Sequence, residues 1–182
     1  MENPFREMTC YVLAGGKRGR EEHFRKEGPQ TRLEKSYRRY ATIFERVALV
    51  LKEDQAREKY LNFPHVCDDD AAMAPAHGIK AALSEAGSGP VFIGSLDIGE
   101  FPLQLIVDLV KSYNGEPFLG YYDPSGDKKN HQPLFGIYSP EMAGKIDEML
   151  AEGECDLRDL MVKQGRLMPL PDDVPAESIG IQ

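Results

Sequence analysis

A glycine turn followed by a basic stretch is the first feature of the sequence that could bind a phosphorylated ligand. The apolar run at residues 8–13 stops at Gly15 and Gly16. Residues 17–26 then supply five Lys and Arg side chains to a protein whose formal net charge is -8 at pH 7. Because glycine has no Cβ, backbone N–H groups at such a turn approach an anion closely, and nearby cations compensate its charge. The spacing is neither that of a P-loop nor GxGxxG, so a plain turn before a solvated basic face explains it equally well.

Carboxylates close two later apolar runs. Asp97 ends the strongest strand candidate, residues 90–97. A carboxylate at a strand tip, beside a bound phosphate, is a ligand that magnesium prefers. An N-cap for the next helix fits less well, because Pro102 lies five residues further on. The weaker run at 65–69 leads into Asp68, Asp69 and Asp70, one of which could contact a metal or nucleotide, although a solvated acidic turn is the alternative.

The elements that must position these residues alternate along the chain. Strand-like runs at 8–13, 46–52, 65–69 and 90–97 are separated by helical patterns at 31–45, 77–87 and 102–113. Further strand candidates lie at 117–123, 133–139, 165–171 and 177–182, and further helices at 142–153 and 156–163. Runs that are apolar on both faces are typical of parallel strands covered by helices on either side. The pattern predicts an α/β fold with a mainly parallel sheet, whose ligand lies beyond the carboxyl ends of the strands.

Composition limits the class of protein. A length of 182 residues favours a single domain spanning 1–182. The acidic balance argues against nucleic-acid binding. No apolar stretch is long enough for a membrane helix and the start lacks a secretory signal, so we expect a cytoplasmic protein without a membrane partner. The three cysteines are widely spaced and predict free thiols.

One family shares this order of motifs. The sequence combines LAGGK at 13–17, Lys26, an acidic residue after the third strand, Asp97, and HQPLFGIYSPEMAGKIDEMLAEGECDLRDLM from His131. In order and spacing it resembles the molybdenum-cofactor guanylyltransferases, members of the nucleotidyltransferase superfamily, across nearly the whole chain. The resemblance implies a Rossmann-like three-layer α/β sandwich of the nucleotide-diphospho-sugar transferase type.

The resemblance also implies an activity and its residues. The activity is transfer of GMP from GTP to the terminal phosphate of molybdopterin, with pyrophosphate release and a requirement for Mg²⁺; molybdoenzyme-maturation proteins are further expected partners. Lys26 would be a catalytic residue that binds a phosphate group, and Asp97 would be the catalytic metal ligand. The implied nucleotide-binding residues are Leu13, Ala14, Gly15, Gly16, Arg18, Arg20, Lys26 and Asp68, with Asp69 as the rival of Asp68. The sequence leaves the oligomeric state open.

The sequence departs from the family pattern at four places. After the second strand, Lys52-Glu53-Asp54 stands where the family often has an Asn, and the usual C-terminal strand and helix are cut to SIGIQ. The other two departures are in motifs. The signature S-x-R-M-G-x-D-K reads R-G-R-E-E-H-F-R-K here, so that Glu21 and Glu22 replace Met-Gly and Arg25 replaces the aspartate. The family's GPLAG is residues 74–78, which keep only the proline and the last glycine. Two alternatives therefore stay open: a transferase that uses another phosphorylated acceptor, and a non-catalytic relative that binds a nucleotide or a partner.

Overall fold

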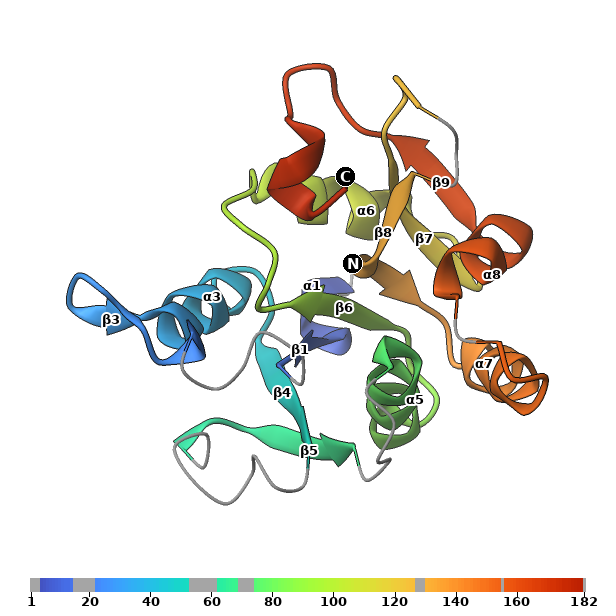
Figure 1. Cartoon of the computed structure of the whole chain (residues 1–182), viewed down its shortest axis with the longest axis horizontal. Coiled ribbons are helices and arrows are strands. Elements are labelled where there is room, and N and C mark those ends of the chain that lie inside the picture. The colour runs from blue at the N-terminus through green and yellow to red at the C-terminus, as the bar shows by residue number, and fades with distance from the viewer. Residues whose placement is uncertain are drawn as a thin grey trace.

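A seven-stranded, mostly parallel sheet forms the centre of the described structure (Figure 1). The structure is a computed structural model, and it describes residues 4–14, 22–52, 62–68, 74–126, 130–154 and 156–181. The strands are β1 (Thr9–Leu13), β4 (Arg46–Lys52), β5 (His65–Asp68), β6 (Val91–Ser95), β7 (Phe118–Tyr122), β8 (His131–Tyr138) and β9 (Arg166–Pro169), in the spatial order β5-β4-β1-β6-β8-β7-β9. Among the described strands of this sheet, only β8 pairs antiparallel, with β6 and β7. The predicted mainly parallel α/β sheet is confirmed.

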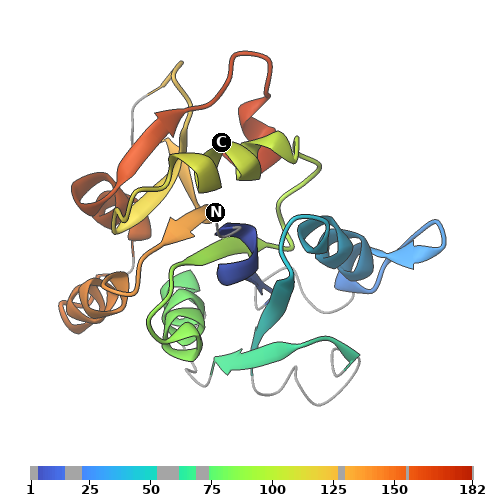
Figure 2. The ribbon, with the colours of Figure 1, turned by 180° about the vertical axis from the view of Figure 1, so that it is seen from behind.

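Helices cover both faces of this sheet, which gives three layers (Figures 1 and 2). One face carries α5 (Pro75–Ala86), α7 (Met142–Ala151) and α8 (Leu157–Gln164); the other carries α1 (Pro4–Glu7), α3 (Arg32–Ala41), α6 (Gln104–Ser112) and the 3₁₀ helix η2 (Ala176–Ile179). Strand β1 shows why, since Cys10 and Val12 join the core beneath α3 while Tyr11 joins the core beneath α5. Successive side chains point to opposite faces, so a strand that is apolar throughout requires both helical layers.

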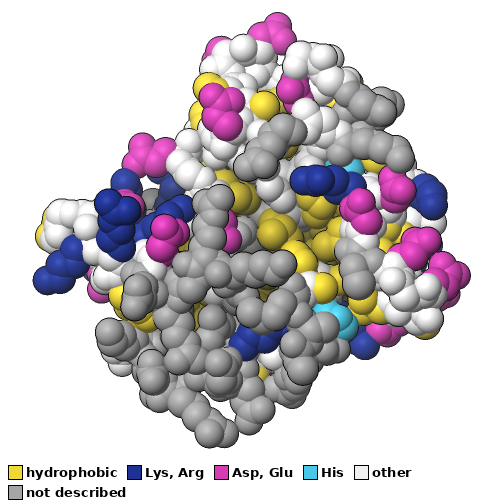
Figure 3. Space-filling model, in the orientation of Figure 1, with side chains coloured by type: hydrophobic (Ala, Val, Ile, Leu, Met, Phe, Trp, Pro, Cys, Tyr) yellow, Lys and Arg dark blue, Asp and Glu magenta, His cyan; other side chains and the backbone are white. Residues whose placement is uncertain are grey.

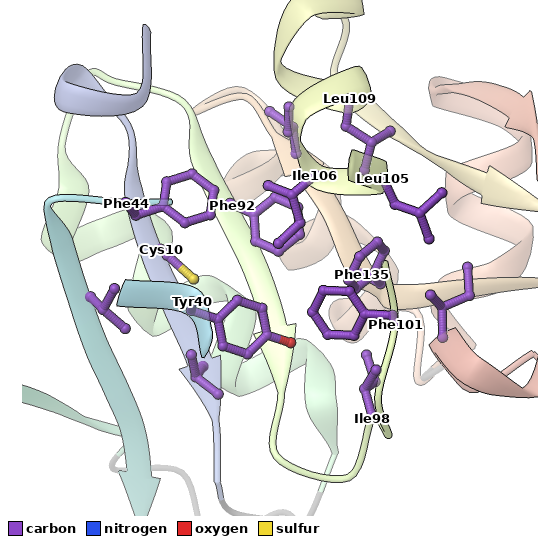
Figure 4. Packing of buried hydrophobic residues seen from close by; sticks show 14 of the residues in the cluster. Cys10, Tyr40, Phe44, Phe92, Ile98, Phe101, Leu105, Ile106, Leu109 and Phe135 are labelled. Atoms are coloured by element: carbon purple, nitrogen blue, oxygen red, sulfur yellow. The ribbon is translucent and has the colours of Figure 1, made fainter. Parts of the chain in front are cut away.

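A row of aromatic rings joins α3 to the loop after β6 (Figure 4). Ring centroids lie 5.2 Å apart for Phe44 and Phe92, 5.3 Å for Phe92 and Phe135, and 4.8 Å for Phe135 and Phe101. Tyr40 of α3 lies against the end of β6, where a Cβ on Gly94 would be 2.6 Å from the Tyr40 hydroxyl. The loop that follows β6 is therefore held by packing from the α3 side.

Helix boundaries follow the expected signals with one exception. Thr31 and Glu34 form a capping box at the start of α3, and Gly87 and Gly153, with φ of 71° and 76°, follow the ends of α5 and α7. The helix expected over 31–45 ends earlier, at Ala41, and a short turn over 42–45 connects it to β4.

One local expectation needs correction, and two local elements were not expected. The strand expected over 177–182 is wrong: the segment forms η2, and Gly180, with φ of 80°, ends it. Its Ile179 and Ile181 bury against the core rather than pairing at a sheet edge. No sequence pattern predicted α1 or the hairpin formed by β2 (Lys26–Glu27) and β3 (Gln30–Thr31).

Two further expectations can be compared with the described residues. Cys10 is a free thiol, as expected, and Cys155 lies outside the described residues. Burial raises the pKa of the Cys10 thiol. Within the ranges given above, none of the helices has the length and apolar character needed to cross a membrane.

Candidate functional site

A cavity of about 140 Å³ lies at the carboxyl ends of four parallel strands. Leu13 comes from the end of β1, Asp68 from the end of β5 and Asp97 from the loop after β6. The remaining described residues around it are Val50, Leu51, Lys52, Ala74, Pro75, Gly78, Ser95 and Leu134. We call this the strand-end cavity. It is the place that an open α/β sheet uses for ligands, and it gathers three of the predicted site residues, which are far apart in the sequence.

A buried ion pair forms part of the wall of the strand-end cavity. Lys52 and Asp68 are direct neighbours in the β4/β5 register, and Lys52 Nζ lies 2.7 Å from Asp68 Oδ2. Their side chains are only 13% and 7% exposed. Because each charge neutralises the other away from water, Asp68 is an ion-paired wall residue. Lys52 was not among the residues predicted for the site; only the β4/β5 register reveals it.

Asp97 lies on an ordered turn rather than in the strand itself. Leu96 N–H still donates to Leu13 O at 3.1 Å, and the chain then turns away from β1. Ser95 Oγ accepts a hydrogen bond from Asp97 N–H at 3.1 Å, and Ser95 O accepts one from Ile98 N–H at 3.4 Å. The Asp97 side chain is exposed and borders the cavity. A carboxylate so placed is available to a ligand in the cavity.

The first turn of α5 closes the cavity opposite the strand ends. Ala74 is the N-cap and makes no side-chain cap bond, and Pro75 occupies the first turn. Gly78 lets the helix approach β1, because a Cβ there would be 3.3 Å from Leu13 Cδ2. The positive end of the α5 dipole thus faces the cavity. Pro75 and Gly78 are the two residues that the 74–78 segment shares with the family motif.

His23 lies near Asp97, a proximity that no sequence pattern predicted. It is 2% exposed, and burial lowers the pKa of its imidazole. The charges of Asp97 and Glu22 act against that shift, and the charge of Arg32 adds to it. The described segment that begins at Glu22 therefore passes close to the loop carrying Asp97.

The remaining predicted site residues lie elsewhere or outside the described ranges. Ala14 is buried, and its N–H donates to Val50 O at 3.0 Å, so it extends the pairing of β1 with β4. Lys26 is exposed on β2 and is not among the residues around the strand-end cavity. Gly15, Gly16, Arg18, Arg20 and Asp69 lie outside the described residues.

The described residues contain no cluster of three or more His, Cys, Asp or Glu side chains that could hold a metal ion by themselves. A site that binds Mg²⁺ through one or two carboxylates together with substrate phosphates does not need such a cluster. Asp97 is the carboxylate that fits this second arrangement.

The family model of the MobA-like NTP transferase domain matches residues 10–167. The chain belongs to this family. The match begins in β1 and ends in β9, so it spans every strand of the seven-stranded sheet. The strand-end cavity thus lies within a MobA-like domain.

Two curated relatives of this MobA-like domain carry the name of one activity. A protein of Aquifex aeolicus, named "Probable molybdenum cofactor guanylyltransferase", is 29% identical over 160 residues, which are 86% of this chain and 76% of the relative. A protein of Haemophilus influenzae, named molybdenum cofactor guanylyltransferase, is 23% identical over 163 residues, which are 87% of this chain and 84% of the relative. The family resemblance expected from the motifs is confirmed.

Solved structures show the same fold. A crystal structure of a protein from Aquifex aeolicus VF5 superposes with a TM-score of 0.73 at 24% identity, covering 96% of this chain and 92% of the other. The molybdopterin-guanine dinucleotide biosynthesis protein A of Archaeoglobus fulgidus gives a TM-score of 0.71 at 17% identity, covering 89% and 83%. The three-layer nucleotidyltransferase-type architecture of this MobA-like domain is confirmed.

Proposed function

We propose that this protein transfers GMP from GTP to the terminal phosphate of molybdopterin and releases pyrophosphate. The observation that carries the proposal is the strand-end cavity, which brings Leu13, Asp68 and Asp97 together in a chain of the MobA-like family. The names of the curated relatives, at 23–29% identity, support the choice of substrates.

The cavity offers suitable chemistry for a guanine base. Leu13, Val50 and Pro75 provide apolar surface for a purine ring. The Lys52–Asp68 pair adds a donor group and an acceptor group to the wall of the cavity. Guanine has an acceptor at O6 and donors at N1 and N2, so both members of the pair can bind it.

The donor set also fits one Mg²⁺ ion. In the proposal Asp97 supplies the protein carboxylate, and the nucleotide phosphates supply further oxygen ligands. Bound there, the ion would neutralise charge on the phosphates.

The protein's own part in the reaction is to bind GTP and the acceptor and to orient their reacting phosphates. An oxygen of the acceptor's terminal phosphate bonds to the α-phosphorus of GTP, the bond from that phosphorus to the β-phosphate oxygen breaks, and the electron pair leaves with pyrophosphate. Little covalent work falls to side chains in such transfers, so positioning and charge compensation dominate. We propose Lys26, which is exposed, as one compensating cation for the phosphates, together with Arg18 and Arg20 of the predicted basic stretch.

Substitution of Asp97 tests the proposal. We expect Asp97→Asn to lower GMP transfer by at least a hundredfold, because an amide cannot replace the charge of a carboxylate at a metal, while the thermal unfolding midpoint is unchanged. Radiolabelled GTP, molybdopterin and Mg²⁺ report both product and pyrophosphate. Asp173→Asn, at an exposed position in the loop after β9, is the matched control and should keep full activity.

Two results would contradict the proposal at different levels. Full transfer by Asp97→Asn in Mg²⁺ would remove the metal-binding role of Asp97 but leave the activity. Failure of the wild-type protein to bind GTP with Mg²⁺ in calorimetry would remove the activity itself. GTP binding without turnover, with molybdopterin present, would instead favour the non-catalytic relative that the altered signature loop allows.

A further inference from the structure

A second cavity lies between α3 and the loop after β6. Its volume is about 360 Å³, larger than that of the strand-end cavity. From α3 it is lined by Arg32, Lys35, Ser36 and Arg39, from the loop by Ile98, Gly99 and Glu100, and from β2 by Glu27. We call it the α3 cavity. In Figure 3, Lys and Arg side chains gather over this end of the molecule, with acidic side chains among them.

The basic residues of the α3 cavity lie on one face of the helix. Arg32, Lys35 and Arg39 are spaced by three and four residues, so their side chains project on the same side over successive turns. They face two carboxylates, those of Glu27 and Glu100. The lining thus places three cations together in a protein whose overall charge is -8, with Glu22 as a further carboxylate beside Arg32.

The acidic partners are exposed and can be exchanged for a ligand. Lys35 Nζ lies 2.6 Å from Glu100 Oε1 and 3.5 Å from Glu27 Oε2, and the two glutamate side chains are 73% and 40% exposed. Arg32 lies 3.5 Å from Glu22, whose side chain is 45% exposed. Exposed ion pairs contribute little to stability because water and salt screen them, whereas a phosphate dianion offers two charges and several acceptor oxygens to both cations at once.

The α3 cavity and the strand-end cavity share one loop. Asp97 borders the strand-end cavity, and the next three residues border the α3 cavity. Arg39 connects this loop to α3, because its Nη2 donates to Phe101 O and its guanidinium lies 4.8 Å from the centre of the Phe101 ring. A molecule in the α3 cavity therefore lies beside the residue proposed to bind the metal and the nucleotide phosphates.

We infer that the α3 cavity binds the phosphate monoester of the acceptor, with Arg32 and Lys35 as its phosphate ligands. The identity of the acceptor rests on the proposed function, whereas the binding of a phosphate monoester in the α3 cavity does not. The nucleotide then occupies the strand-end cavity and the acceptor the α3 cavity, on the two sides of the loop at 97–100.

Calorimetry with phenyl phosphate tests the inference, since this monoester has no nucleobase. We expect the wild-type protein to bind it both alone and when saturated with a non-hydrolysable GTP analogue. The double variant Arg32→Gln/Lys35→Gln should bind it at least tenfold more weakly, and the charge-preserving Arg32→Lys/Lys35→Arg should bind it as the wild type does. Arg38→Gln removes a charge from an exposed position of the same helix that does not line the cavity, and it should have no effect.

Two results would overturn the inference. Equal binding of phenyl phosphate by the wild type and by a folded Arg32→Gln/Lys35→Gln variant would show that these cations are not its ligands. Displacement of phenyl phosphate by the GTP analogue would assign it to the nucleotide's own phosphate site.

The test separates the inference from the proposed function. Should the wild type fail to bind the GTP analogue, the titration without nucleotide still decides whether the α3 cavity binds a monoester. In an active enzyme, the double variant should raise the KM for molybdopterin at least tenfold and leave the Kd for GTP unchanged. If the double variant transfers GMP with an unchanged KM for molybdopterin, the inference is wrong but the proposed function stands.

Discussion

The two cavities beside the loop at 97–100 use charge in opposite ways. In the strand-end cavity a lysine and an aspartate lie on adjacent strands and are almost fully shielded from water, with side chains 13% and 7% exposed. In the α3 cavity the lysine is 48% exposed and its closest glutamate 73%. A buried pair is costly to break because the remaining charge is left without compensation, whereas an exposed pair is screened and easily exchanged. The buried Lys52–Asp68 pair therefore stays intact as part of the cavity wall. The exposed Lys35–Glu100 pair can separate, so that Lys35 binds a ligand instead.

The largest expected effect is on the buried pair. Asp68→Ala leaves the Lys52 ammonium in a wall shielded from water, and we expect it to lower the free energy of unfolding by about 3 kcal/mol. Urea denaturation measures this change. The double variant Lys52→Met/Asp68→Leu removes both charges and should recover most of the loss. An Asp68→Ala variant as stable as the wild type would refute the distinction between the two cavities.

Arg39 should have the next largest effect, because it ties the shared loop to α3. Arg39→Met keeps the apolar stem but loses the hydrogen bond to Phe101 O and the contact with the Phe101 ring. We expect about 2 kcal/mol lower stability, since a hydrogen bond from a charged donor and a cation–π contact are both lost. Arg38→Met, on the exposed side of the same helix, should change the urea midpoint little. Equal effects of the two variants would mean that Arg39 does not hold the loop.

His23 should make stability depend on pH at the edge of the strand-end cavity. Burial lowers the pKa of its imidazole below 6.5 in the folded protein, despite the opposing charges of Asp97 and Glu22, and Arg32 adds to the shift. The unfolded chain therefore binds the proton first as the pH falls. The contribution of His23 is fully present above about pH 6.5 and is lost as the pH falls toward the folded pKa, with a slope of at most about 1.4 kcal/mol per pH unit.

Urea unfolding between pH 7.5 and 5 measures this slope. His23→Gln should flatten it by removing the titrating group, and His77→Gln, at a partly exposed position on α5, is the control. An unchanged slope in His23→Gln would show that His23 titrates alike in the folded and unfolded chains.

The sequence predicted the sheet better than the site because the two depend on different kinds of contact. Apolar runs such as 46–52 and 90–97 are local signals, and they became β4 and β6. Gly87 and Gly153 are local signals of a helix C-terminus as well, and each follows the end of a helix. Segment 177–182 shows the limit of such patterns, because its apolar residues predicted a strand but pack over the core as a 3₁₀ turn.

The site depends on contacts between distant residues. Asp97 could be predicted because the tip of a strand is visible in the sequence. The role of Lys52 requires the β4/β5 register that sets it opposite Asp68, and His23 acquires its environment only when its segment packs near Asp97. The α3 cavity likewise forms between a helix and a loop some 60 residues further along the chain, for instance where Arg39 meets Phe101 at a sequence separation of 62. Its spacing of basic residues is visible in the sequence, but their position beside Asp97 is not.

The smallest expected effect is on the exposed pair of the α3 cavity. Lys35 holds the pKa of the Glu100 carboxyl below its usual value through a hydrogen bond and charge, so this interaction is present at neutral pH and is lost as the pH falls through the lowered pKa. Glu100→Gln should leave the urea midpoint at pH 7 almost unchanged, because the carboxylate is exposed to solvent. The same substitution should instead tighten binding of phenyl phosphate, since it removes an anion that competes for Lys35. Calorimetry at 50 and 300 mM salt should show the gain shrinking as screening increases; a large loss of stability with no gain in binding would mean that the exposed pair is structural, like the buried one.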